Sequence, residues 1–307
     1  MVPKLLLLLM SLCALEACTS NREAVSRDSI NASGHLAPPP DSDHTARRSK
    51  PTPVVIGESF TIASRALGET RRMNVFIPTT YGELLDAPLP VLYMLDGGVS
   101  EDFLHIAGLV QVLVSNGGMR PFMLVGVENT QRRRDMTGPT TSEDDRKIAP
   151  VVGGSAAFRR FIKDELMPEV RARYRTTDEA AVIGESLAGL FVLETFVLEP
   201  DTFGTYIAID PSLWWNNGGL VTSIGVQGRP TSTATPTNAA KAVVLASSNE
   251  PSAVELTASV VGAFEVHQRG GVEFRHMHFP GETHATIYHP AALAAIRALF
   301  APAKDRQ

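Results

Sequence analysis

The chain has 307 residues, 44% of them hydrophobic, which is enough to build the core of one large domain or two ordinary ones. This composition excludes disorder throughout, and 24 Gly, 21 Pro and only two Cys exclude collagen-like and disulfide-scaffold proteins. There are 28 Lys and Arg against 33 Asp and Glu, so the formal charge of −5 provides no basic surplus for binding a nucleic-acid backbone.

Residues 1–18 have the pattern of an export signal. Lys4 precedes an apolar run over 5–15 that is too short to span a bilayer as a permanent helix. The segment closes with Leu15-Glu16-Ala17-Cys18, which resembles a bacterial lipoprotein box in which Cys18 carries the lipid. We therefore expect an exported protein, periplasmic or membrane-anchored through Cys18, with an ordinary cleaved signal or an uncleaved anchor as alternatives.

Residues 19–52 are predicted to form a flexible tether, because they are rich in Ser, Asn, Asp, Arg and Pro and have no apolar periodicity. The folded domain is expected over 53–307. No cysteine follows Cys18 in the sequence, so this domain is expected to be stabilised by its core without a disulfide.

The folded part begins with two apolar runs, over 59–67 and 71–77, which are joined by Gly68-Glu69-Thr70 and predict a β-hairpin. Six further runs are predicted to be strands of a mostly parallel sheet. The first four of them do not alternate, as is typical of strands that are covered on both faces. The six runs are 91–95, 123–127, 180–183, 206–209, 242–246 and 272–279.

Segments with helical spacing separate these strands, at about 101–114, 156–174, 187–198, 253–268 and 290–300. Strands that alternate with helices predict an α/β fold with helices on both faces of one eight-stranded sheet. The stretch over 218–238 is rich in Gly, Thr, Ser and Pro without a clear period, and we expect a loop there.

The sharpest local motif is Gly184-Glu185-Ser186-Leu187-Ala188-Gly189, in which a strand runs through a Gly-x-Ser turn into a helix. A tight turn of this kind presents the serine hydroxyl above the sheet and requires small neighbours. Ser186 is the predicted nucleophile, and an N-cap of the following helix is the alternative. Leu187, the next residue, is expected to donate one backbone N–H to the oxyanion, and Gly97 of Asp96-Gly97-Gly98 is expected to donate the second.

A serine needs a base, and the base needs a carboxylate to orient it. Among the histidines that follow Ser186, His284 is chosen because its loop leaves the last strand ahead of the final helix; His289 is held in reserve. Glu250, in the loop after the strand at 242–246, is the expected acid. The alternatives are Asp210, directly after the strand at 206–209, and Glu255.

At this point the sequence resembles the putative-esterase family of α/β hydrolases, which contains esterase D, enterochelin esterases, some feruloyl and acetylxylan esterases, and mycolyltransferases. The resemblance is closest to a siderophore-esterase-like branch and covers about 60–300. Four segments besides the elbow carry it: 91–98, 125–137, 209–215 and 281–284. It implies an α/β-hydrolase catalytic domain with Ser186, Glu250 and His284 in acyl transfer to water, or with a Ser-His pair alone. It implies no cofactor and no metal.

Two groups of residues in these segments are candidates for binding substrate. Arg132 and Arg134 lie on the loop after the strand at 123–127, at the sheet edge where such folds bind ligands, and would suit an acidic or polyoxygenated ester. The alternative is that Arg134 pairs with Asp135 to hold the loop while the other arginines of this segment are solvated. Trp214 and Trp215 follow the strand at 206–209 and are expected either to wall the pocket or to pack in the core.

The leading hypothesis is a metal-free serine esterase acting on esters of small acids, aryl esters or siderophore-like lactones. One alternative is acyl transfer to an acceptor other than water. The other is a non-catalytic lipoprotein that binds a ligand in the same cleft. The expected partner is a small-molecule ester, with no nucleic acid, and with the membrane only through Cys18.

Overall fold

The computed structural model describes residues 51–80, 83–227, 241–266 and 272–302, and every structural statement below concerns these residues. The predicted signal, Cys18 and nearly all of the predicted tether lie outside the described residues, so export and lipidation stay predictions. Within the described ranges, no helix combines the length and the apolar character needed to cross a bilayer.

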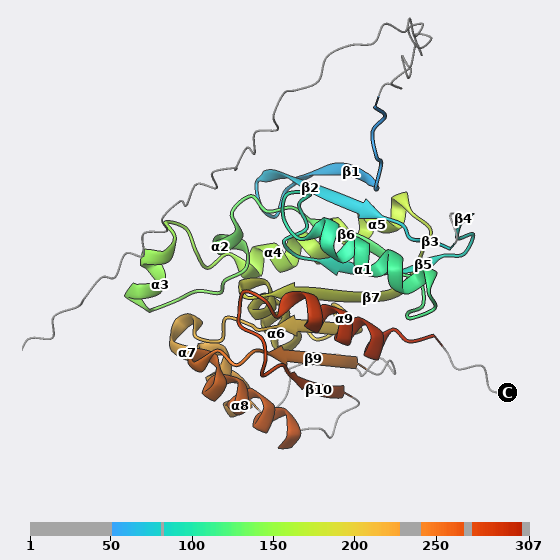
Figure 1. Ribbon diagram of the computed structural model, residues 1–307. Helices are drawn as coiled ribbons and strands as arrows, with labels where there is room; N and C mark the ends of the chain where they lie inside the picture. Colours follow the sequence, from blue (N-terminus) through green and yellow to red (C-terminus); the bar gives the residue numbers. More distant parts are fainter. Residues whose placement is uncertain (1–50, 81–82, 228–240, 267–271, 303–307) are drawn as a thin grey trace, which may run out of the picture. The chain divides into compact units, whose positions relative to one another are not determined.

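One eight-stranded sheet forms the middle of the fold, in the order β1-β2-β6-β5-β7-β8-β9-β10 (Figure 1). β1 (Glu58–Ser64) and β2 (Glu69–Phe76) form the predicted antiparallel hairpin, and β2 also pairs antiparallel with β6 (Met123–Val127). All other neighbouring strands are parallel. They are β5 (Leu89–Met94), β7 (Thr176–Glu185), β8 (Thr205–Ile209), β9 (Lys241–Ser247) and β10 (Val272–His278). The expected mostly parallel α/β-hydrolase sheet is confirmed.

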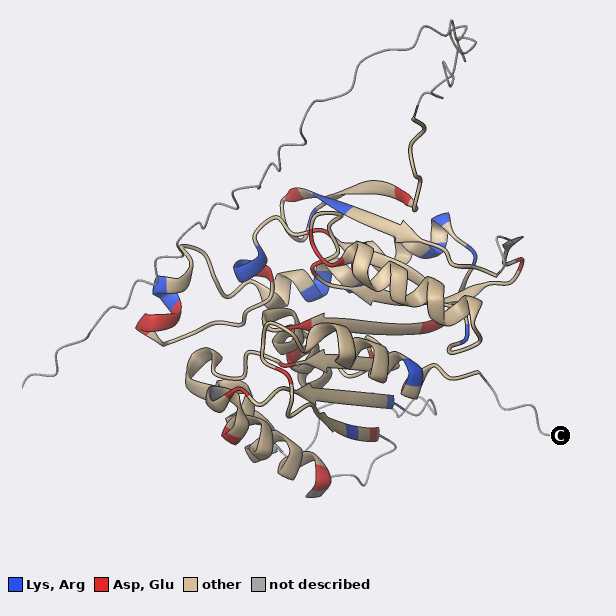
Figure 2. Cartoon of the chain, viewed as in Figure 1, with Lys and Arg blue, Asp and Glu red and all other residues tan. Residues whose placement is uncertain are grey.

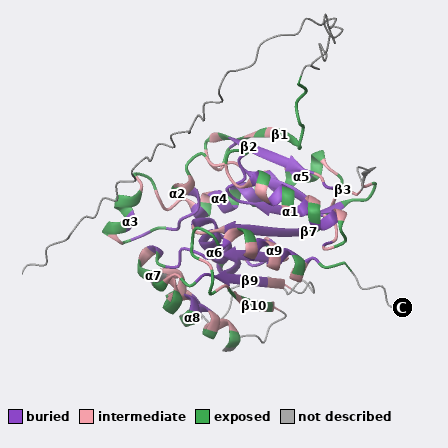
Figure 3. Cartoon of the chain, in the orientation of Figure 1, coloured by how far each residue is buried: buried purple, intermediate pink, exposed green. Residues whose placement is uncertain are grey.

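The non-alternating apolar runs arise because both faces of the central strands are covered. Along β5, Val91 and Tyr93 enter the core on one face, while Leu92 and Met94 enter the core on the other. Every residue of β5 and β6 is buried (Figure 3). Burial on both faces favours continuous apolar runs over the alternation of a half-exposed strand.

Helices form a layer on each side of the sheet. One core contains side chains of α1 (Phe103–Ser115) and α9 (Tyr288–Leu299). The other contains side chains of α4 (Ser155–Phe161), a π-helical turn (Ile162–Leu166), α5 (Met167–Arg173), α6 (Leu187–Leu198) and α8 (Pro251–Val266). α6 is apolar nearly all round because it is enclosed against the middle of the sheet.

Several short elements were not expected from the sequence. They are a two-stranded sheet of β3 (Thr79–Thr80) and β4 (Glu83–Leu84), and the short helices α2 (Arg132–Asp135) and α3 (Glu143–Ile148). A longer unexpected element is α7 (Trp215–Gln227), which is kinked by left-handed backbone at residues 216–218. α7 replaces the first half of the loop expected over 218–238. Ile224 is buried there, and Leu220 and Val221 pack against the core, so tertiary burial overrides a Gly- and Ser-rich composition. Residues 228–238 of that loop lie outside the described residues.

Candidate active site

Ser186 lies in the sharp turn between β7 and α6, with φ +60° and ψ −120°. A positive φ is unfavourable for a residue with a side chain and persists only where the surroundings enforce it. Here the Ser186 N–H donates to the Ile209 carbonyl at 3.0 Å, and the Ser186 carbonyl accepts the N–H groups of Leu190 and Ser212. The strained turn therefore holds the hydroxyl in a defined place above the carboxyl ends of the strands.

The residues around this turn have to be small. A Cβ on Gly184 would lie 2.7 Å from the Cβ of Ala188, and one on Gly189 would lie 2.9 Å from the carbonyl oxygen of Ile209. Ala188 at the second small position of the motif fits only because Gly184 has no side chain. The departure from a strict Gly-x-Ser-x-Gly motif is thus accommodated by Gly184.

His284 approaches the serine from the loop between β10 and α9. Its Nε2 lies 3.0 Å from Ser186 Oγ, and its side chain is 45% exposed. The reserve candidate His289 is engaged elsewhere, because its Nδ1 lies 2.7 Å from Nε2 of His105. The hydroxyl of Ser212 is a further neighbour, 3.3 Å from Ser186 Oγ. The structure therefore brings Ser186 and His284 into direct contact.

The carboxylate that contacts His284 is Asp210, and the expectation for Glu250 is corrected. Asp210 Oδ2 lies 2.7 Å from His284 Nδ1, and the two carboxylate oxygens accept the backbone N–H and the hydroxyl of Ser248 at 2.8 and 2.9 Å. Asp210 follows β8, the strand that pairs with the nucleophile strand β7, whereas Glu250 follows β9, one strand farther away. The Glu250 N–H donates to Ser248 Oγ, and Glu255 is exposed on α8.

The electrostatics of the contacts among Asp210, His284 and Ser186 suit His284 to act as a base. Burial opposes ionisation of Asp210, but the hydrogen bonds from His284 and Ser248 outweigh it and hold the pKa of Asp210 below its usual value. The hydrogen bond to Asp210 in turn raises the pKa of His284 above its ordinary value of 6.5, despite partial desolvation, and the charges of Glu185, Asp210 and Glu250 add to the rise. An ionised Asp210 thus favours a proton on Nδ1 and leaves Nε2 as the acceptor.

Gly97 does not occupy the place expected of an oxyanion donor. Its N–H donates to the Val127 carbonyl at 2.9 Å, and a Cβ at this position would lie 2.3 Å from Gly126 Cα. Gly97 is therefore required by the close packing of the loop after β5 against β6. The Gly98 N–H donates to the Glu101 carboxylate at 2.7 Å. Leu187 is the first residue of α6, so its N–H has no acceptor within the helix and stays the predicted donor.

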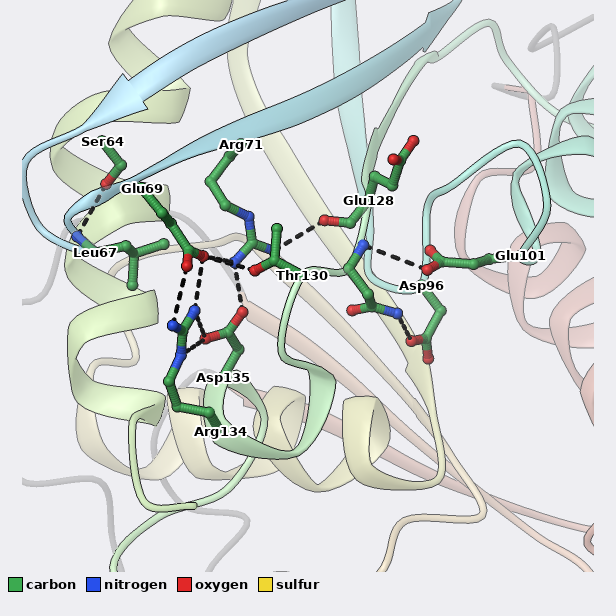
Figure 4. Close-up of polar contacts among 11 residues, drawn as sticks. Ser64, Leu67, Glu69, Arg71, Asp96, Glu101, Glu128, Thr130, Arg134 and Asp135 are labelled. Atoms are coloured by element: carbon green, nitrogen blue, oxygen red, sulfur yellow. Dashed lines mark hydrogen bonds and ion pairs between the residues drawn. The ribbon is translucent and has the colours of Figure 1, made fainter. Parts of the chain in front are cut away.

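The arginines of α2 are held by carboxylates, which corrects their predicted role in binding substrate. Arg132 makes a bidentate pair with Asp96 at 2.6 and 2.8 Å, and its Nη2 lies 3.4 Å from the Glu185 carbonyl. Arg134 pairs with Glu69 at 2.7 Å and with Asp135 at 2.6 Å (Figure 4). The bidentate and buried partners outcompete water for these guanidinium groups. The Arg134–Asp135 pair of the alternative is present, but Arg132 is paired with Asp96 and is not merely solvated.

The two tryptophans have different surroundings. Trp215 is buried in the core, and its Nε1 donates to the Gly138 carbonyl at 2.9 Å, so it is a packing residue and not a pocket wall. Trp214 is 40% exposed and follows β8 by five residues, on the same segment as Asp210 and Ser212. Of the pair, only Trp214 stays a candidate for contact with a substrate.

Two residues of the site were missed by sequence reasoning. Ser212 lies within the quoted segment over 209–215, and Glu185 is the variable residue of the elbow. The Glu185 carboxylate lies 3.4 Å from His284 Nε2. The sequence did offer one signal, because Glu185 and Ser212 lie within two residues of the candidates Ser186 and Asp210. Position in the sequence, however, does not indicate whether a side chain points into the site.

The chain is similar to several known proteins. A family model described as "Putative esterase" matches residues 64–269. The chain is 33% identical over 165 residues to the ferri-bacillibactin esterase BesA of Bacillus subtilis, covering 48% of this chain and 56% of that protein. It is 32% identical over 190 residues to the siderophore triacetylfusarinine C esterase of Aspergillus fumigatus, covering 55% of this chain and 60% of that protein.

Among solved structures, the fold is similar to an IroE-like serine hydrolase from Shewanella oneidensis. The TM-score is 0.68 at 27% identity, and the match covers 80% of each chain. The matched segments span little more than half the length of the two curated relatives named above.

Proposed function

Since the chain belongs to the putative-esterase family, we propose that it is a serine esterase that hydrolyses small-molecule carboxylic esters through an acyl-enzyme. One observation carries the proposal: a continuous series of contacts runs from Ser186 Oγ to His284 Nε2 at 3.0 Å and from His284 Nδ1 to Asp210 at 2.7 Å. This is the arrangement that activates a serine hydroxyl near neutral pH.

In the first half of the reaction, His284 Nε2 takes the proton of Ser186 as Oγ attacks the ester carbonyl carbon. Leu187 is the proposed backbone N–H donor to the oxygen that becomes negative, and Asp210 stabilises the imidazolium. When the tetrahedral intermediate collapses, the bond to the alcohol oxygen breaks and His284 returns the proton to that oxygen. In the second half, His284 takes a proton from water, the resulting attack releases the acid, and Ser186 recovers its proton.

The substrate class follows from the relatives, two of which are esterases of siderophores. We propose siderophore-like or aryl esters of small acids for this chain. The half-exposed Trp214, on the segment that also carries Asp210, offers an aromatic surface for such a group.

Labelling with a fluorophosphonate tests the proposal. We expect one equivalent of label on Ser186, found by peptide mapping, together with a burst of one equivalent of p-nitrophenol from p-nitrophenyl acetate. Ser186→Ala is expected to abolish both signals. Ser212→Ala is the matched control, because it removes a hydroxyl 3.3 Å away and is expected to keep the label on Ser186. A folded wild-type protein that is neither labelled nor active on acetate, butyrate or octanoate esters contradicts the proposal.

The acid limb of the pH profile is a second expected result. His284 acts as a base only when it is neutral, and its pKa is raised above 6.5, so kcat/KM on a neutral ester should fall as the pH drops through a value above 6.5. Initial rates at substrate concentrations well below KM, from pH 5 to 9, measure the limb. An acid limb at or below the pKa of free imidazole argues against the Asp210–His284 contact in solution.

A further inference from the structure

Glu185 is a partly buried carboxylate in the active site that the mechanism above does not use. It is the last residue of β7 and directly precedes the nucleophile, and its side chain is only 18% exposed. Its Oε1 lies 3.4 Å from His284 Nε2, the same nitrogen that lies 3.0 Å from Ser186 Oγ. Glu185 Oε1 and Ser186 Oγ thus contact the same nitrogen of His284, so the Glu185 carboxylate lies beside the reacting hydroxyl.

His284 Nε2 also has to deliver its proton to the departing alcohol oxygen. That oxygen must therefore come within hydrogen-bond distance of Nε2 while Glu185 Oε1 remains close to the same nitrogen. The alcohol half of the ester, more than the acyl half, is thus the part of the substrate that lies near the Glu185 carboxylate.

The groups around Glu185 do not cancel its charge for an incoming anion. The charged groups with the largest effect on Glu185 are His284, Arg132, Asp96 and Asp210, and Glu185 itself acts on the neighbouring Tyr288. Arg132 is the cation among them apart from the histidine, and Asp96 already pairs with it through two hydrogen bonds. Figure 2 shows the basic turn of α2 beside acidic segments at this edge of the sheet.

We propose that Glu185 is a specificity-determining residue that disfavours esters whose alcohol half carries a negative charge near the scissile bond. The inference rests on the proposed esterase function. A second negative charge about 8 Å from this carboxylate, at an effective dielectric constant between about 80 and about 20, is repelled strongly enough to change a rate roughly 3- to 30-fold. Neutral or cationic alcohol groups avoid this repulsion.

The proposal has a pH signature. Burial, with the charges of Asp96 and Asp210, raises the pKa of Glu185 to about 7, although His284 and Arg132 oppose the rise. The carboxyl is neutral below its raised pKa and negative above it, so discrimination should appear as the pH rises through that pKa. Protonation of His284 affects both substrates alike and therefore cancels in a ratio of their rates.

The test compares methyl 3-acetoxybenzoate with 3-acetoxybenzoate, which differ by one negative charge on the alcohol half. The ratio of their kcat/KM values is measured from pH 5.5 to 8.5. For the wild-type protein we expect this ratio, neutral over anionic, to rise roughly 3- to 30-fold across the range and to rise less at high salt. In Glu185→Gln the ratio should stay flat. Glu255→Gln, an exposed charge change on α8, should keep the wild-type rise.

The possible outcomes separate this inference from the function on which it rests. A flat ratio in an active wild-type protein, or a wild-type rise in Glu185→Gln, overturns the inference and leaves the esterase intact. Hydrolysis of neither ester by a protein that turns over p-nitrophenyl acetate overturns the inference alone. No turnover of any of these esters, together with no label on Ser186, overturns both. The wild-type pH dependence needs no variant, so the test remains decisive even if Glu185→Gln does not fold.

Discussion

Replacing Asp210 with asparagine should lower kcat/KM by a factor of roughly 10³ to 10⁴, as expected when a buried carboxylate no longer fixes the tautomer of its histidine. The surroundings explain why. Oδ1 of Asp210 accepts the Ser248 N–H, so the amide oxygen of an asparagine would take that place. Its NH₂ group would then face His284 Nδ1, now 2.7 Å from Oδ2. Nδ1 becomes an acceptor, the proton moves to Nε2, and Nε2 can no longer take the proton of Ser186.

Steady-state rates on p-nitrophenyl butyrate at pH 8 measure this effect, with Glu250→Gln as the matched control. Glu250 carries the same charge but makes no direct contact with the imidazole within the described residues, so its loss should change kcat/KM by only a few-fold. If Glu250→Gln were as damaging as Asp210→Asn, the assignment of the acid would be wrong. If neither mattered, the enzyme would work with Ser186 and His284 alone.

The choice between Asp210 and Glu250 as the acid shows what the sequence could predict about the site and what it could not. The elbow at Ser186 and the loop of His284 were predictable, because strand, turn and helix are encoded by local composition. Asp210 and Glu250 both follow a predicted strand by one to a few residues, and local pattern does not distinguish them. The choice depends on which strand end lies next to β7 and on the φ of +41° that Asp210 adopts, both of which are set by tertiary packing.

The arginines of α2 show the same limit for charge. Arg132 and Arg134 are at the predicted edge of the sheet, but their partners Asp96 and Glu69 are 36 and 65 residues away in the chain. The sequence predicts the sign of a charge and its approximate place in the fold. Whether a charged side chain is free to bind a ligand depends on partners that are distant in the sequence. A cationic cleft was therefore the wrong expectation, and the negative charge of Glu185 was the missed one.

The largest expected effect on stability is at Arg71, whose side chain is fully buried on β2. Its guanidinium contacts Glu69, Asp135 and the Glu128 carbonyl (Figure 4). It also lies 5.1 Å from the centre of the Phe158 ring. Arg71→Met would leave Asp135, also fully buried, with Arg134 alone. Removing one member of a buried ion pair typically costs about 3 to 5 kcal/mol, and we expect a loss of that order in the free energy of unfolding.

Urea denaturation at pH 7 measures this loss, and Arg72→Met is the control on the next residue of the same strand. The Arg72 side chain is half exposed and lies 3.8 Å from Glu128, so its loss should cost at most about 0.5 kcal/mol. Combining Arg71→Met with Asp135→Leu should recover part of the loss, because the stranded carboxylate is removed as well. An Arg71→Met midpoint equal to the wild-type midpoint would contradict the assignment. Because Asp135 ends the same short helix that carries Arg132, this network also fixes the segment that holds Asp96 beside the elbow.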